Sequence, residues 1–150
     1  MNKMRLLPLL FSCLLLLTLV SCNKDDDMDT APSRMELLTN GVWAGDQVHA
    51  EGTDMTTEVN TYFGIDVKQL RYNFKKDGTV EEASDIEAVP EGSWEFTNDE
   101  QAIIINKGTE EEQVFTINQL TASDLYLEGE FEIDEEMVIE AEIRLKRTSM

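Results

Sequence analysis

Apolar and polar residues alternate with a period of two along most of the chain after residue 40, which is the pattern of half-buried β-strands. In the clearest stretch Leu70, Tyr72 and Phe74 alternate with polar residues, so one face of the strand is apolar and the other is wet. Asp77-Gly78 follows directly. We expect these two residues to form a hairpin turn, because both tolerate the positive φ that tight hairpins require.

Turn residues separate the remaining strands in the same way, most clearly at Asn98-Asp99 and Lys107-Gly108. No long helical segment interrupts the series, so we expect consecutive hairpins. The pattern predicts an all-β fold, either a small antiparallel up-and-down β-barrel of about eight strands or a strongly curved sheet. The predicted strands are residues 42–49, 70–75, 79–83, the segment with Trp94 and Phe96, 102–106, 113–120, 125–131 and 137–146.

The connection between the first two strands, residues 50–67, is long for a compact domain. Met55, Val59 and Tyr62-Phe63 recur in it at helical spacing before Gly64. This spacing predicts a short amphipathic helix. We expect the helix to lie across one end of the barrel.

The N-terminus has the three parts of a secretory signal. Basic Lys3 and Arg5 precede an apolar run, residues 6–20, that ends in Leu19-Val20-Ser21-Cys22. That tetrapeptide resembles the lipobox at which lipoproteins are acylated and cleaved. A transmembrane helix is the alternative, but the run is shorter than the ~20 residues that span a bilayer and contains Pro8.

This interpretation divides the chain into three parts. Residues 1–21 are a cleaved lipoprotein signal peptide, residues 22–34 a lipidated acidic tether that begins at Cys22, and residues 35–150 the barrel domain. An acidic cluster follows the lipidated cysteine after Asn23-Lys24 and resembles the surface-export signal of outer-membrane lipoproteins in one phylum of Gram-negative bacteria. The resemblance implies a protein anchored in the outer membrane and facing the cell surface. A solvated tether is the other interpretation, and both can hold. The cluster consists of Asp25, Asp26 and Asp27.

Charge and cysteine content narrow the function classes. The chain has 31 Asp and Glu against 12 Lys and Arg, a formal charge of −19, and loss of Lys3 and Arg5 with the signal peptide brings the mature chain to −21. Nucleic acid is excluded as a partner, because a phosphate-binding surface needs clustered cations. Cys13 leaves with the signal peptide and Cys22 is acylated, so no thiol remains for a disulfide, a nucleophile or a zinc site.

Enzymatic chemistry has little support in the sequence. The single histidine, His49, has no nucleophile or metal partner near it in the chain, so we expect neither an enzyme nor a cofactor. Two acidic runs, residues 110–112 and 134–136, offer the oxygen ligands that Ca²⁺ prefers. Both lack the ligand spacing of a calcium loop. We interpret them as solvated hairpin tips and predict no metal site.

Four segments, in this order and spacing, resemble the bacterial lipocalin-like domains of lipid-anchored surface proteins. The resemblance covers residues 35–147, although the chain is shorter than typical lipocalins and lacks their disulfide. It implies that Trp43 packs at the closed end of the barrel with Arg144 or Arg147 stacked on it, and that residues 54–63 lid the open end. The segments are Leu37-Leu38-Thr39-Asn40-Gly41-Val42-Trp43, residues 72–80, Gly92-Ser93-Trp94-Glu95-Phe96 followed by Ile103-Ile104-Ile105, and residues 120–125.

Two functions remain open. An eight-stranded barrel is just wide enough to hold its own side chains or one small ligand. The first function is binding of a small apolar or amphipathic molecule, with a cavity beneath Tyr62 and Phe63. The second is a surface interaction module, in which a filled barrel contacts protein or glycan through its loops. The candidate ligand-binding residues, whose bulk suits a filled core equally well, are Tyr62, Phe63, Tyr72, Phe74, Trp94, Phe96 and Phe115.

Overall fold

The structure is a computed structural model that describes residues 31–83, 91–134 and 137–148. The predicted signal peptide, the predicted lipidation site Cys22 and the acidic cluster at Asp25, Asp26 and Asp27 lie outside the described residues. The described part belongs to one compact unit that begins at Pro32.

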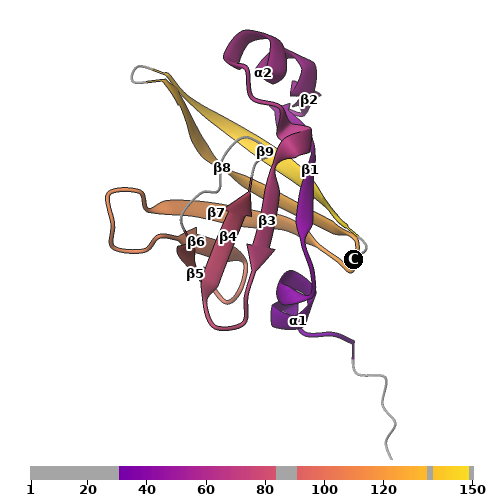
Figure 1. Cartoon of the computed structure of the whole chain (residues 1–150), viewed down its shortest axis with the longest axis vertical. Helices are drawn as coiled ribbons and strands as arrows, with labels where there is room; N and C mark the ends of the chain where they lie inside the picture. Colours follow the sequence, from indigo (N-terminus) through magenta and orange to yellow (C-terminus); the bar gives the residue numbers. More distant parts are fainter. Residues whose placement is uncertain (1–30, 84–90, 135–136, 149–150) are drawn as a thin grey trace, which may run out of the picture. The chain divides into compact units, whose positions relative to one another are not determined.

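Nine strands form a single antiparallel sheet in which neighbours in sequence are neighbours in space, apart from the two-residue strand β2 (Figure 1). Pairing of β9 with β1 closes the other eight into a barrel. The elements are α1 (Arg34–Thr39), β1 (Trp43–Ala50), β2 (Thr53–Asp54), α2 (Thr56–Phe63), the 3₁₀ helix η1 (Val67–Gln69), β3 (Arg71–Phe74), β4 (Thr79–Ala83), β5 (Gly92–Thr97), β6 (Ala102–Ile105), β7 (Gln113–Leu120), β8 (Asp124–Asp134) and β9 (Met137–Arg147).

The predicted fold class is confirmed: the protein is an all-β up-and-down barrel with a short helix in the first long connection. The β3–β4 hairpin turns at the predicted residues, but the turn does not use a positive φ at both of them. Only Gly78 has a positive φ, 87°. Asp77 instead fixes the turn through its carboxylate, whose Oδ1 accepts hydrogen bonds from the backbone N–H and the hydroxyl of Thr79 at 3.0 and 2.7 Å.

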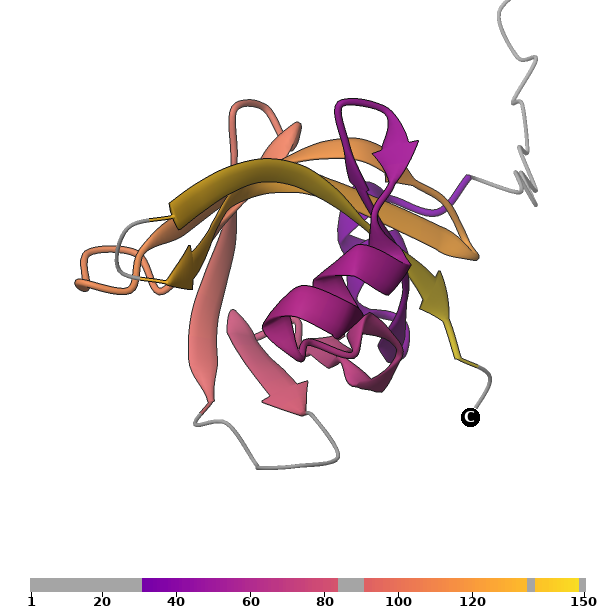
Figure 2. The same cartoon turned by 90° about the horizontal axis from the view of Figure 1, so that it is seen from above.

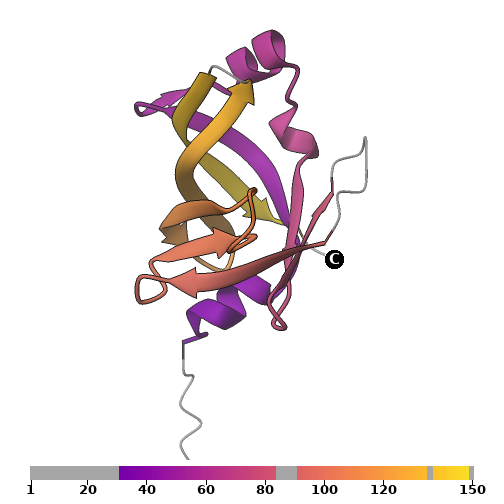
Figure 3. The ribbon, with the colours of Figure 1, turned by 90° about the vertical axis from the view of Figure 1, so that its left-hand side faces the viewer.

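Helix α1 lies at one end of the barrel, opposite the end that carries α2 (Figures 1 and 3). A capping box starts α1: the Ser33 hydroxyl accepts from the backbone N–H of Glu36 at 3.2 Å, and the Glu36 carboxylate accepts from the backbone N–H of Ser33 at 2.8 Å. The capped helix therefore begins just before residue 35, the expected start of the domain. Leu38 is the fully buried residue of α1.

Trp43 packs at this closed end as the family resemblance implies. Its side chain is fully buried, and its indole Nε1 donates to the carbonyl of Leu38 at 2.9 Å. The guanidinium carbon of Arg147 lies 4.5 Å from the centroid of the Trp43 ring, and the same guanidinium donates to the carbonyls of Leu37 and Asn40. Arg147 thus ties the last strand to the first strand and to α1.

Of the two predicted partners of Trp43, Arg147 is therefore correct and Arg144 is wrong. Side chains alternate along β9, and Leu145 faces the core, so Arg144 beside it faces outward. Its guanidinium carbon lies 4.8 Å from the centroid of the Tyr126 ring on that outer face. Arg147 is the Cα partner of Trp43 across the β1–β9 ladder, and this register lets it reach the indole.

Helix α2 ends at Gly64, as predicted, in the left-handed conformation (φ 71°). It packs at the other end of the barrel through Val59, which is buried in a small cluster with Val48, Val67 and Ala141 (Figure 2). Helix η1 approaches β1 so closely that a Cβ on Gly45 would lie 1.8 Å from the carbonyl oxygen of Val67. Within the described ranges no helix is long and apolar enough to cross a bilayer.

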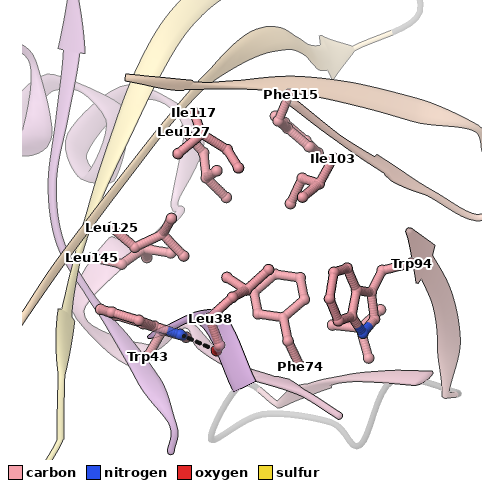
Figure 4. Close-up of a cluster of buried hydrophobic side chains, with 11 residues drawn as sticks. Leu38, Trp43, Phe74, Trp94, Ile103, Phe115, Ile117, Leu125, Leu127 and Leu145 are labelled. Carbon is pink, nitrogen blue, oxygen red and sulfur yellow. Dashed lines mark hydrogen bonds between the residues drawn. The ribbon is translucent and has the colours of Figure 1, made fainter. Parts of the chain in front are cut away.

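The main core lies between α1 and the middle of the barrel, where inward-facing side chains converge (Figure 4). Phe74 packs edge-on against Trp94 with ring centroids 5.6 Å apart. The buried members of this core are Leu38, Trp43, Phe74, Val80, Trp94, Ile103, Phe115, Ile117, Leu125, Leu127 and Leu145.

Candidate ligand cavity in the barrel

A cavity of about 430 Å³ lies inside the barrel, between the main core and the cluster beneath α2. Leu70, Phe131 and Ile143 belong to its wall and also pack on the α2 cluster. Asn106 and Glu111, at the β6–β7 connection, line it as well. Because that connection lies at the end of the strands away from α1, the cavity extends from mid-barrel toward the end that carries α2.

Most of the wall is apolar, because the strands turn every second side chain inward. Phe115 on β7, Leu127 on β8 and Leu145 on β9 reach the cavity from the main core. The volume lies within the range of small-molecule sites, roughly 300–1,000 Å³. The arrangement therefore suits one compact apolar molecule.

Two polar side chains face each other on the β3–β4 part of this wall. The register pairs Tyr72 with Glu82 and Phe74 with Val80. Phe74 and Val80 are buried, and Tyr72 and Glu82 lie two positions from them on the same strands, so they face the barrel interior as well. The Tyr72 hydroxyl donates to Glu82 Oε1 at 3.2 Å. The side chains of both residues line the cavity.

Burial changes the protonation of this pair. It raises the pKa of the Tyr72 hydroxyl far above its ordinary value, and the nearby Glu82 carboxylate raises it further. Burial also raises the pKa of the Glu82 carboxyl, and the hydrogen bond from Tyr72 opposes that rise. Tyr72 therefore stays a neutral donor, and Glu82 is an acid whose charged form is poorly solvated.

Three of the seven predicted ligand-binding residues line the cavity: Tyr72, Phe74 and Phe115. Trp94 and Phe96 do not. Trp94 is buried in the main core, with its ring centroid 5.3 Å from that of Phe96, which packs on the same core.

Tyr62 and Phe63 lie on α2 outside the cavity. Tyr62 is 77% exposed and Phe63 39% exposed, because Val59 occupies the buried side of the helix. Ile65, two residues after α2, contributes to the cavity wall instead. Three apolar residues that are close together in the chain are exposed here, and we refer to them as the exposed patch: Tyr62, Phe63 and Ile65.

Larger hollows of about 670 and 730 Å³ lie on the outer face of the β7–β8–β9–β1 part of the sheet. Outward-facing Glu128 and Glu140 line both, so these hollows are acidic and wet. His49 lies in one of them, half-buried, with its Nε2 3.3 Å from Gln47 Oε1. Within the described ranges no three His, Cys, Asp or Glu side chains gather as metal ligands.

Glu82 was not among the predicted site residues, although the sequence pattern marks it. Val80 is the apolar residue of its strand, and Glu82 follows two positions later on the same face. A charged residue in the inward phase of a barrel strand is unusual, since buried charges are costly without partners. That departure from the alternating pattern marks the polar part of the cavity.

No known family matches this sequence, and no curated protein is similar to it. The barrel and its cavity are therefore the basis on which function is inferred.

Proposed function

We propose that this protein is a lipid-anchored surface lipoprotein whose lipocalin-like barrel binds one small apolar or amphipathic molecule. The observation that carries the binding proposal is the cavity of about 430 Å³ with a largely apolar wall. Binding is favourable when an apolar ligand replaces water against the apolar wall of a barrel. Each Å² of apolar surface buried in this way contributes about 25 cal/mol to the binding free energy. No catalytic step is assigned to the site.

The proposed anchor rests on the lipobox-like segment that ends at Cys22, and the proposed surface location on Asp25, Asp26 and Asp27. An N-terminal lipid would hold the barrel at a membrane, where apolar and amphipathic molecules are abundant. Each buried CH₂ of an acyl chain contributes about 0.8 kcal/mol, so two or three chains anchor the protein stably.

A surface interaction module is the second candidate, and the exposed patch of Tyr62, Phe63 and Ile65 favours it. These residues lie on α2 and directly after it, at the end toward which the cavity extends. The exposure of these residues therefore has two possible explanations: a partner docks on them, or a ligand passes them on its way into the cavity.

Binding of the apolar dye nile red to the mature chain (residues 22–150, with Cys22→Ser to remove the acyl chains) tests the proposal. We expect one dye per chain. Ile143→Trp fills part of the cavity, so it should weaken binding at least about tenfold. Val138→Trp is the matched control on the same strand, because Val138 is 55% exposed and outside the cavity.

Equal dye affinity in the two tryptophan variants would contradict binding inside the barrel. If Tyr62→Ala abolished dye binding while Ile143→Trp left it intact, the exposed patch would be the binding surface and the second candidate would be favoured.

A further inference from the structure

The cavity is not uniformly apolar, and its polar side chains carry one kind of charge. Among the described residues, the titratable members of its wall are Tyr72, Glu82 and Glu111, and no Lys or Arg contributes to the wall. Of the three, Glu82 lies on an inward-facing strand position and Glu111 in the β6–β7 connection. In the described part of the wall, a ligand therefore meets two carboxylates, a hydroxyl and the amides of Asn106 and Gln113, and no cation.

Glu82 is partly buried, and its carboxylate has little compensation for the water that it loses there. Tyr72 supplies one hydrogen bond, at 3.2 Å, and the ion pairs of the described residues do not include Glu82. Even partial burial of a carboxylate is costly unless a cation or several donors satisfy its oxygens. The site thus has room for a charged donor beside Glu82.

The neighbouring residue on the same strand shows the contrast. Glu81 faces outward, where its carboxylate accepts from Lys75 Nζ at 2.6 Å and from the amide of Asn73 at 2.8 Å. The two adjacent glutamates therefore have different surroundings: the outer one has a cation and an amide as donors, and the inner one faces the cavity.

We infer that Glu82 and Tyr72 select an amphiphile with an ammonium head group, whose alkyl chain fills the apolar part of the cavity. An ammonium group supplies the missing positive charge and up to three donors for the Glu82 carboxylate, and such charge-assisted hydrogen bonds are the stronger kind. A fatty acid would place a second carboxylate beside Glu82, in a chain whose mature form carries a charge of −21. This inference rests on the proposed binding function and names its ligand class.

The test compares decylamine, decanol and decanoate, which share an alkyl chain and differ in head group, by isothermal titration calorimetry of the mature chain with Cys22→Ser. The wild-type barrel should bind decylamine at least about tenfold more tightly than decanoate, with decanol between them. Glu82→Gln should weaken decylamine binding roughly tenfold to a hundredfold, as expected for loss of a hydrogen-bonded charge. Glu81→Gln, the matched control, should change it less than about twofold.

The outcomes separate the two proposals. If decanol or decanoate binds as tightly as decylamine, or if Glu82→Gln behaves like Glu81→Gln, the head-group inference fails and the binding function stands. If none of the three compounds binds the wild-type chain, both fail. The head-group comparison needs no variant, so it remains decisive even if Glu82→Gln does not fold.

Discussion

Arg147 is the residue that holds the closed end of the barrel together. It stacks on Trp43 and donates to two carbonyls of the α1 segment, so a single side chain links the two chain ends of the domain. Stacking of an arginine on an indole contributes about 0.5–2 kcal/mol, and hydrogen bonds from a charged donor add to it.

Arg147→Ala should therefore lower the free energy of unfolding by about 2–4 kcal/mol, measured by urea denaturation. Arg144→Ala is the control, because Arg144 lies on the outer face over Tyr126 and pairs with Glu142 at 2.7 Å. Its loss should cost less than about 1 kcal/mol. A larger effect from Arg144→Ala than from Arg147→Ala would refute the assignment of Arg147 to the closed end.

Glu82 makes the stability of the fold depend on pH. Burial raises the pKa of its carboxyl, so the folded protein holds this proton more tightly than the unfolded chain does. The resulting stability is present below the ordinary Glu pKa, about 4.3, and is lost as pH rises through the raised folded value. Glu82→Gln should therefore raise the free energy of unfolding at pH 7 and leave it nearly unchanged at pH 4.

Glu81→Gln should have the opposite sign. The hydrogen bond from Lys75 lowers the pKa of Glu81, so this carboxylate stabilises the fold above its ordinary pKa and stops doing so as pH falls through the lowered value. Urea unfolding of both variants at the two pH values checks the pair. If Glu82→Gln and Glu81→Gln changed the free energy of unfolding equally at pH 7, the inferred difference between the surroundings of the two glutamates would be contradicted.

At the scale of elements, α2 is held to the barrel by few apolar contacts. Val59 is buried, whereas Tyr62 on the same helix is 77% exposed. Val59→Ala should loosen α2 by about 1–3 kcal/mol, since two methylene equivalents and their packing are lost.

Hydrogen exchange of the α2 amides measures this effect. We expect faster exchange in α2 for Val59→Ala while the β8–β9 ladder keeps its protection, because that ladder pairs along its whole length. Tyr62→Ala is the control and should leave exchange unchanged. Loss of protection throughout the barrel in Val59→Ala would mean that α2 and the barrel unfold as one unit.

The strands and α2 were predictable from the sequence because period-two and helical patterns directly report which faces are buried. The cavity was not, because sequence patterns show that a side chain points inward but not whether its neighbours fill the space around it. Phe74 and Trp94 have the same inward pattern, yet only Phe74 reaches the cavity. Arg144 and Arg147 differ in role through the β1–β9 register, which pairs residues about a hundred positions apart.

At the scale of the whole molecule, the proposed anchor predicts where the protein is found. Cys22→Ala removes the residue that would be acylated. The variant should therefore carry no lipid and should no longer be found in the membrane fraction as a processed, acylated protein. Metabolic labelling with a fatty acid and mass spectrometry of the N-terminal peptide check this. Continued labelling of the Cys22→Ala chain would exclude Cys22 as the lipidation site.

Native mass spectrometry of the mature protein, purified from its own host, tests directly whether the barrel holds a small molecule. We predict a bound species that is released on denaturation, absent from Ile143→Trp and retained by Val138→Trp. A bare protein mass in all three samples, or a species retained equally by Ile143→Trp, would contradict the claim.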